Sequence, residues 1–503
     1  MSSCISMRPA PSIGSDDTYI KDGGVTCDSS ASAISTSASS SDGYCSDHQD
    51  CNSWGPATFE ESGALDALLG DASVSKLPTG FDMEGLVREL TANTTTENPL
   101  FVVNLSTVMK KLNDWRKALP RVKPLYAMKC NSDEKICRVL AQAGCGFDCA
   151  SKGEIILAQE LGVTSENIIY ANPCKQANML RYAREVGVRL MTADNVEELH
   201  KIRDIFPEAR VVLRIAVDDS KSVCRFNSKF GAPPAEWDAF LSTAKELGLD
   251  VTGVSFHVGS GCGDLQPFAD AVASARDCFD LMSTRYGFSP NYLDIGGGWP
   301  GHDQGSFSFK DVASVVGEAI DQHFPASCGV EIVAEPGRYF AHASHTLAVK
   351  VIAKRQLSKA QLADTSEIES FGARPTKDTI STDDGFKKAE ASENQPEVAL
   401  YINDGVYGVF NCVVFDHAHV YPKALERRGG VRTVNTKLFG PTCDSIDVVM
   451  PCTRLPEMNV GEWLWFDGMG AYTRLSSLMK DERKPRFNGQ GAFDIHYVWA
   501  GMP

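Results

Sequence analysis

From residue 99 onward, short apolar segments alternate with longer segments in which apolar residues recur at helical spacing. A short apolar run bounded by polar residues predicts a buried strand, whereas apolar positions three and four residues apart predict a helix. Helical spacing occurs, for example, at residues 132–143 and 151–161. The strands expected before residue 343 are at residues 100–104, 124–128, 146–149, 168–170, 190–192, 210–215, 251–256, 292–295 and 331–334.

These repeated strand–helix units predict an α/β fold with a parallel sheet. About 240 residues of such units suit a closed (β/α)8 barrel, which we expect over residues 99–343. A doubly wound open sheet is the alternative. It would more naturally carry a GxGxxG turn after the first strand, and the sequence has none there.

The pattern changes after residue 343, where strand-like segments follow one another without helices between them. We therefore expect a mainly β domain over residues 344–503. A polar insertion at 356–396 is expected to be a loop, because it is rich in Asp, Glu, Ser and Lys. The strands expected here are at residues 346–353, 397–402, 409–415, 461–466 and 493–499.

The beginning of the chain differs from both regions. Residues 1–60 are rich in serine and poor in large apolar residues, so they cannot offset their ordering entropy and are expected to be disordered. Apolar periodicity starts near residue 65, and the segment 61–98 is expected to pack on the β domain.

Charge and cysteine usage limit the function classes. The 503 residues contain 49 Lys and Arg against 65 Asp and Glu, a net charge of −16, which argues against nucleic acid or an anionic membrane as partner. No apolar run approaches the ~18 residues of a membrane span, and no secretory signal pattern is present. The 16 cysteines are scattered without paired CxxC units, so we expect no metal site and a cytoplasmic protein with reduced thiols.

Three strand-end segments carry candidate chemistry. Lys129, in YAMKCN, follows a predicted strand, where partial desolvation would suit it to Schiff-base formation, although a loop lysine is the simpler interpretation. Gly296, Gly297 and Gly298 follow another strand and could hold a phosphate, or only form a tight turn. Glu335, in the EPGR turn 335–338, could pair with a protonated ring nitrogen, or lie on the surface. Together they are the parts that pyridoxal phosphate needs.

Longer motifs make a family resemblance specific. From residue 100 to the carboxyl end, the chain resembles the eukaryotic ornithine decarboxylases, which are pyridoxal-phosphate enzymes with an alanine-racemase-like barrel. The matching stretches are YAMKCN (126–131), GFDCASKGE (146–154), YANPCKQ (170–176), SFHVGSGC (255–262), DIGGGWPG (294–301), EPGRY (335–339), YINDGVYGVFNC (401–412), FDHAH (415–419), GPTCDSID (440–447) and MGAYT (469–473).

The resemblance implies roles for individual residues around pyridoxal 5′-phosphate. Lys129 would hold the cofactor covalently, and His257 would stack on its ring. The other residues implied to bind or support the cofactor are Asp148, Glu154, Arg214, Ser260, Gly296, Gly297, Gly298, Glu335, Pro336, Gly337, Arg338 and Tyr472.

The resemblance also implies a substrate and an oligomer. The enzyme would convert L-ornithine to putrescine and CO2, with Cys443 returning a proton to the product and with Phe415, Asp416 and Asp444 receiving the distal ammonium. The Cys443 segment would enter the site of the other subunit of a homodimer, and Lys229 and Asp447 would form an ion pair between subunits.

Alternatives remain at this stage. A lysine, arginine or diaminopimelate decarboxylase would use the same fold, and a non-catalytic regulatory homologue would bind a partner instead. A racemase needs a second base, and GPTCDSID offers a thiol beside a carboxylate. Binding of an inhibitory regulator protein is also open. The retention of Lys129, Gly298, Arg338, Cys443 and Asp444 favours the enzyme.

Overall fold

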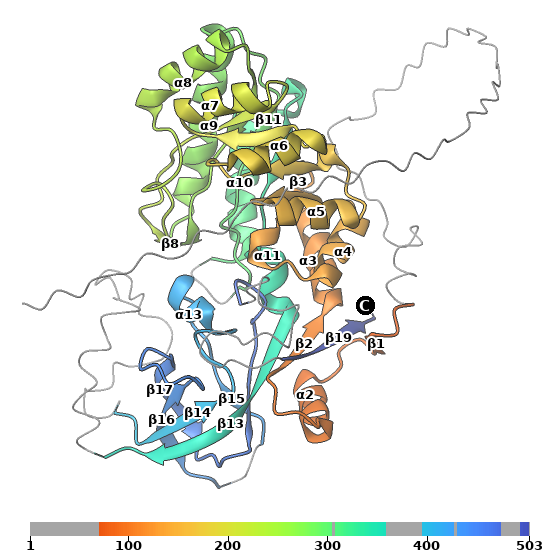
Figure 1. Cartoon of the computed structure of the whole chain (residues 1–503), viewed down its shortest axis with the longest axis vertical. Helices are drawn as coiled ribbons and strands as arrows, with labels where there is room; N and C mark the ends of the chain where they lie inside the picture. The colour runs from red at the N-terminus through yellow and green to blue at the C-terminus, as the bar shows by residue number, and fades with distance from the viewer. Residues whose placement is uncertain (1–69, 304–306, 359–394, 427–429, 474–492, 502–503) are drawn as a thin grey trace, which may run out of the picture. The chain divides into compact units, whose positions relative to one another are not determined.

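The structure is a computed structural model that describes residues 70–303, 307–358, 395–426, 430–473 and 493–501 (Figure 1). The expected disordered segment at 1–60 and nearly all of the insertion expected at 356–396 lie outside these residues.

Eight parallel strands close into a barrel, as the strand–helix pattern predicts. Going round the barrel, the strands are β11 (Tyr292–Asp294), β12 (Glu331–Ala334), β3 (Val122–Ala127), β4 (Gly146–Cys149), β5 (Ile168–Tyr170), β6 (Leu190–Ala193), β7 (Arg210–Arg214) and β9 (Asp250–Ser255). These strands are almost entirely buried, which is why their sequences are continuous apolar runs.

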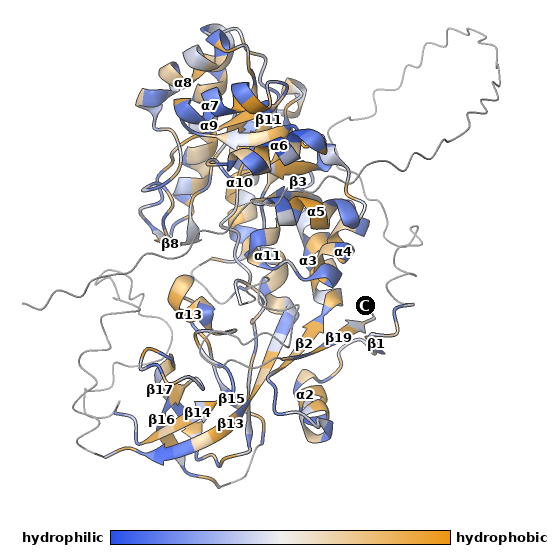
Figure 2. Cartoon of the chain, viewed as in Figure 1, coloured by the Kyte–Doolittle hydropathy of each residue, from blue (hydrophilic) through white to orange (hydrophobic). Residues whose placement is uncertain are grey.

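Helices surround the barrel strands (Figure 1). They are α3 (Leu105–Ala118), α4 (Glu134–Gln142), α5 (Lys152–Glu160), α6 (Ala177–Glu185), α7 (Val196–Ile205), α8 (Pro234–Glu246), α9 (Gln266–Thr284) and α10 (Phe309–His323). Figure 2 shows hydrophilic and hydrophobic residues mixed on helices such as α7 and α8, as expected for helices with one face on a core and one in water. No helix in the described ranges is long and apolar enough to cross a membrane.

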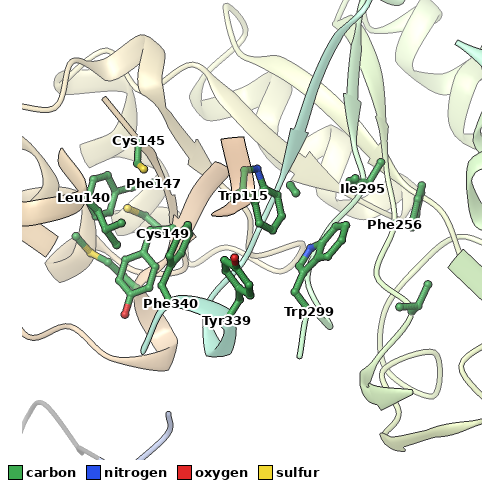
Figure 3. Packing of buried hydrophobic residues seen from close by; sticks show 14 of the residues in the cluster. Trp115, Leu140, Cys145, Phe147, Cys149, Phe256, Ile295, Trp299, Tyr339 and Phe340 are labelled. Carbon is green, nitrogen blue, oxygen red and sulfur yellow. The ribbon is translucent and has the colours of Figure 1, made fainter. Parts of the chain in front are cut away.

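An aromatic cluster packs α3 against α10 and the segments that follow β11 and β12. The Trp115 ring on α3 lies 4.8 Å from Trp299 and 5.4 Å from Tyr339 and Phe309, measured between ring centroids (Figure 3). Its indole N–H donates to the carbonyl of Val122 at 2.9 Å, so the polar edge is also satisfied. Because Trp299 directly follows the three glycines, this packing anchors the glycine loop.

The second sheet has nine strands. In order they are β1 (Val74–Leu77), β19 (Asp494–Ala500), β2 (Leu100–Asn104), β13 (His345–Gln356), β14 (Val398–Ile402), β16 (Thr433–Phe439) and β17 (Val448–Pro456). Off this path, β18 (Trp463–Phe466) pairs with β13, and β15 (Lys423–Ala424) pairs with β18. Strand β2, expected within the barrel region, pairs with β13 and β19 here, so the barrel begins at β3. Helix α2 (Met83–Asn93) packs on the same sheet through a cluster that includes Trp463 and Trp465.

The strand expected at 409–415 is wrong, because this segment contains helix α13 (Asn411–Phe415). The Asn411 amide donates to the carbonyls of Gly408 and Thr473, and these tertiary contacts override the β-propensity of the valines. The remaining short elements are η2 (Met128–Cys130), η3 (Ser165–Asn167), β8 (Ser222–Cys224), β10 (Ser260–Cys262), η4 (Ala326–Cys328), α11 (Arg338–Ala341) and η5 (His342–Ser344).

Candidate active site

A cavity open to solvent lies beyond the carboxyl ends of several barrel strands, where barrels of this type carry their chemistry. Most of the predicted cofactor residues meet here, together with Ala127 and Trp299. The lining residues are Ala127, Lys129, His257, Ser260, Gly297, Gly298, Trp299, Glu335, Gly337, Arg338 and Tyr472.

Lys129 is held at the cavity by a buried carboxylate. It lies in η2 directly after β3, and its Nζ donates to Asp148 Oδ2 at 2.7 Å. The register of β3 and β4 pairs Ala127 with Asp148, which brings the carboxylate alongside. Desolvation alone would lower the pKa of Lys129, but the charges of Asp148 and Glu335 outweigh it and raise that pKa above its usual value.

His257, which follows β9, is a neutral aromatic group in this site. Burial, with the nearby charges of Arg214 and Lys129, lowers the pKa of His257 well below its usual value. Its Nδ1 accepts from the Gly259 N–H at 3.0 Å, which leaves the proton of the neutral ring on Nε2. The Phe226 ring meets the imidazole edge-on, with centroids 4.8 Å apart. These contacts fix the ring plane, as stacking on a cofactor requires.

The glycine loop after β11 has no room for side chains. Gly296 and Gly298 have φ of 64° and 96°, which disfavour other residues. A β-carbon at Gly298 would lie 2.5 Å from the Gly259 carbonyl oxygen, and one at Gly297 would lie 2.6 Å from His257 Nε2. The loop is therefore pressed against the segment that carries the imidazole.

The turn after β12 brings a carboxyl group, Glu335, and a guanidinium group, Arg338, into the cavity. Burial raises the pKa of Glu335 well above its usual value, and neighbouring carboxylates add to the effect. Arg338 opens α11, and its Nη2 donates to Asp416 Oδ1 at 2.6 Å. The guanidinium carbon lies 5.1 Å from the centre of the Tyr472 ring. The Tyr472 N–H in turn donates to the Cys130 carbonyl at 2.9 Å, so the two sheets meet at this site.

The other predicted cofactor residues lie just behind the lining. Glu154, in the first turn of α5, accepts from the Ala150 N–H, and burial raises its pKa to about 7. Arg214 ends β7 with its guanidinium carbon 5.2 Å from the Phe230 ring centre. Pro336 accepts from the Ala127 N–H at 3.3 Å through its carbonyl.

Four of the predicted substrate and catalytic residues do not line this cavity, namely Phe415, Asp416, Cys443 and Asp444. Asp416 is joined to it through its ion pair with Arg338, which does line it. Phe415 is 76% exposed at the end of α13, and Cys443 is exposed in the turn after β16. Asp444, in the same turn, accepts a hydrogen bond from the Tyr407 hydroxyl. The resemblance places this turn in the site of a second subunit, and that role stays a prediction.

The expected intersubunit pair of Lys229 and Asp447 is also still a prediction. Asp447 is buried, and its carboxylate accepts from the N–H of Val406 at 2.8 Å and from the N–H and hydroxyl of Thr442 at 3.0 and 2.7 Å. Lys229 Nζ lies 4.9 Å from the Phe230 ring centre. Within this chain, Asp447 braces the turn that carries Cys443.

Some contributors were not singled out from sequence. Trp299 and Ala127 line the cavity, and Phe226 backs His257. Asp294, the first residue of the DIGGGWPG motif, is fully buried at the end of β11. An acidic residue at a strand end directly before the glycines was the available signal for Asp294, whereas the contact of Phe226 depends on the path of a long loop.

The arrangement fits pyridoxal 5′-phosphate. Gly297 and Gly298 form a cradle that any β-carbon would fill, and Arg338 supplies a positive charge beside it. Asp148 Oδ1 is buried without a hydrogen-bond partner among the described residues, so the carboxylate behind Lys129 can accept one more donor. No cluster of side chains suited to a metal ion is found in the described ranges.

Comparisons with known proteins agree with this chemistry. The family model "Pyridoxal-dependent decarboxylase, pyridoxal binding domain" matches residues 105–342. Ornithine decarboxylase from Mus musculus is 45% identical over 403 residues, covering 80% of this chain and 81% of that protein. Antizyme inhibitor 2 from Xenopus laevis is 44% identical, covering 83% and 84%.

A solved structure adds the fold. The arginine decarboxylase of Paramecium bursaria Chlorella virus matches with a TM-score of 0.70 at 32% identity, covering 83% of this chain and 100% of that one. The relatives at 44 and 45% identity cover most of the chain, and the cavity holds the residues that a pyridoxal enzyme needs. The chain therefore belongs to the ornithine decarboxylase family of pyridoxal-dependent decarboxylases.

Proposed function

We propose that the chain converts L-ornithine to putrescine and CO2 with pyridoxal 5′-phosphate bound at Lys129, the first step of polyamine synthesis. One observation carries the proposal: Lys129 after β3, His257 after β9, and Glu335 with Arg338 after β12 come from three separate strand ends and meet in one cavity. The curated ornithine decarboxylases, at up to 45% identity, support the choice of substrate.

The cavity residues divide the work of holding the cofactor. Lys129 would bind it covalently, the neutral imidazole of His257 would stack on the ring, and Glu335 would face the ring nitrogen. Ser260, the glycine loop, Arg338 and Tyr472 would hold the phosphate. When bound, the cofactor accepts the electron pair that departing CO2 leaves behind.

Asp416 has an oxygen available for the substrate. Its Oδ1 accepts from Arg338, whereas Oδ2 is buried with no partner among the described residues. A buried carboxylate oxygen without a donor is costly, and a primary ammonium would satisfy it with a charge-assisted hydrogen bond. The structure thus supports Asp416 as the receptor of the distal ammonium of ornithine.

A substrate panel tests the proposal. Purified protein with pyridoxal 5′-phosphate would be assayed for CO2 release from ornithine, lysine and arginine, with Lys129→Ala as the matched control. We expect ornithine to react fastest and lysine, which is longer by one methylene, to be slower by roughly 10- to 200-fold in kcat/KM. Faster release from lysine or arginine would overturn the choice of ornithine.

A non-catalytic regulator is the second candidate, because antizyme inhibitor 2 from Xenopus laevis is 44% identical. The intact Lys129–Asp148 pair argues against it, since a protein without the reaction has no need of a lysine held at the cavity by a buried carboxylate. Release of no CO2 from any of the three amino acids would favour this candidate.

We further propose a homodimer with shared sites, in which the turn of Cys443 and Asp444 reaches the partner's cavity and Cys443 protonates the product. Exposure of Cys443 on a turn braced by buried Asp447 supports this placement. Mixing inactive Lys129→Ala and Cys443→Ala proteins should restore roughly a quarter of wild-type activity, because half of randomly mixed dimers hold one intact site. Mixtures as inactive as their parents would contradict shared sites.

Cytoplasmic location and binding of an inhibitory regulator protein remain predictions. Cell fractionation tests the first, and size-exclusion chromatography of the protein with a candidate regulator tests the second.

A further inference from the structure

Two buried carboxyl groups meet behind the cavity with no donor between them. Asp294 ends β11 and is fully buried, and Glu335, after the neighbouring strand β12, is 8% exposed. The register of β11 and β12 sets Asp294 opposite Val333, two residues before Glu335, and the two carboxyl groups interact electrostatically. Asp294 Oδ1 already accepts from the Gly296 N–H at 2.8 Å, whereas Oδ2 has no N–H or O–H partner among the described residues.

Two ionised carboxylates cannot satisfy each other in a buried place, because both are acceptors and like charges repel. A single proton between them removes both penalties: one carboxyl donates and the other accepts. The shared proton then gives Asp294 Oδ2, which has no other donor among the described residues, its missing partner. Burial raises the pKa of both groups, in keeping with a proton retained at neutral pH.

The surrounding charges favour the same state. The charged neighbours of the pair are the Asp148 carboxylate from β4 and the cations of Lys129 and Arg214. The buried phenol of Tyr292 and the neutral imidazole of His257 lie nearby without a charge. With one proton on the pair, two negative groups face two positive ones, whereas full ionisation would leave an uncompensated buried charge.

The pair is also joined to the glycine loop. The Gly296 N–H donates to Asp294, and the Gly296 carbonyl accepts from the Glu335 N–H at 2.8 Å. A shift of the Asp294 carboxyl would therefore move the loop that we assign to phosphate. We propose that Asp294 and Glu335 share one proton, and that Asp294 is a positioning residue that ties the carboxyl facing the cofactor ring to the glycine loop.

Infrared spectroscopy of the substrate-free holoenzyme tests this proposal, because a protonated carboxyl absorbs at higher frequency than a carboxylate. Asn at position 294 can still accept from Gly296 and can donate its amide to Glu335, so Asp294→Asn keeps the contacts without the proton. Gln at position 335 does the same from the other side. We expect Asp294→Asn and Glu335→Gln each to remove the same single carboxyl absorption at pH about 7.

Two controls separate this band from other effects. Glu154→Gln removes a different buried carboxyl, whose pKa is also raised to about 7. This variant should therefore leave the absorption band of the Asp294–Glu335 pair in place. Asp404→Asn changes another buried aspartate, which accepts from the N–H groups of Gly405 and Val409, and should leave the band in place.

The proposal rests on the proposed function only in taking Glu335 to face the cofactor ring. Because no substrate is present, the infrared result is independent of whether ornithine is decarboxylated. Persistence of the band in either Asp294→Asn or Glu335→Gln, or its absence from the wild type at neutral pH, would overturn the shared proton. If one variant fails to fold, the other variant and the pH titration of the wild-type band decide the matter.

Discussion

The contact between the glycine loop and His257 yields a sharp prediction for Gly297→Ala. A β-carbon at this position would lie 2.6 Å from His257 Nε2 and 3.1 Å from the Glu335 carbonyl oxygen. The imidazole would have to retreat by about 0.8 Å to reach an ordinary contact near 3.4 Å. Since the φ of Gly297 is not positive, alanine is compatible with the backbone, and the displacement falls mainly on the ring.

We expect this displacement to weaken cofactor binding strongly while the fold survives. A misplacement near 1 Å typically costs ~10²-fold, so the dissociation constant for pyridoxal 5′-phosphate should rise roughly 30- to 100-fold, or about 2–3 kcal/mol. Titration of cofactor-depleted protein, followed through quenching of tryptophan fluorescence, measures it, because Trp299 lines the cavity.

Gly317→Ala is the matched control. Gly317 lies in helix α10 with no atom within 4 Å of a new β-carbon, so alanine should leave binding unchanged and stabilise the protein by ~0.5–1 kcal/mol. In a His257→Ala background, Gly297→Ala should have little further effect, as a double-mutant cycle would show. Wild-type affinity in the single Gly297→Ala variant would refute the proposed packing of loop and ring.

Three further outcomes follow from the structure. Asp416→Ala should raise the KM for ornithine roughly 10- to 100-fold, because it removes a charge-assisted hydrogen bond to the substrate. The control Asp467→Ala, which breaks an exposed ion pair, should leave the KM unchanged, and an unchanged KM in Asp416→Ala would exclude Asp416 from substrate binding. The folded-state pKa of Glu154 is raised from 4.5 to about 7, so the free energy of unfolding should fall by up to roughly 3 kcal/mol as the pH rises through that window. Denaturant unfolding of Glu154→Gln should show a smaller fall over the same pH range, and an equal fall would contradict the burial argument. Trp115→Ala should lower the free energy of unfolding by ~3–5 kcal/mol, and a loss under 1 kcal/mol would contradict its role in the core.

The barrel could be predicted because each of its strands is buried on both faces and reads as an apolar run. Strand β2 shows the limit of that signal: Leu100–Asn104 is as apolar as a barrel strand, and only its pairing with β13 and β19 assigns it to the other sheet. Strand β16 alternates polar and apolar residues and was not expected, whereas the valines of α13 suggested a strand that tertiary contacts prevent.

The candidate site shows the same division. Lys129, the glycines and Glu335 could be singled out because each follows a predicted strand, and the carboxyl ends of parallel strands meet at one end of a barrel. The ion pair of Arg338 with Asp416 could not be foreseen, since it joins residues 78 positions apart on α11 and just after α13. The meeting of Asp294 with Glu335 likewise depends on strand register rather than on either motif alone.

The central claim is that Lys129 holds the cofactor of a decarboxylase. Borohydride reduction of the holoenzyme, followed by peptide mapping with mass spectrometry, tests it most directly. We predict a pyridoxyl adduct on Lys129 within the peptide that contains YAMKCN, and loss of the adduct when ornithine is added in excess before reduction. An adduct on another lysine, or none at all, would contradict the account.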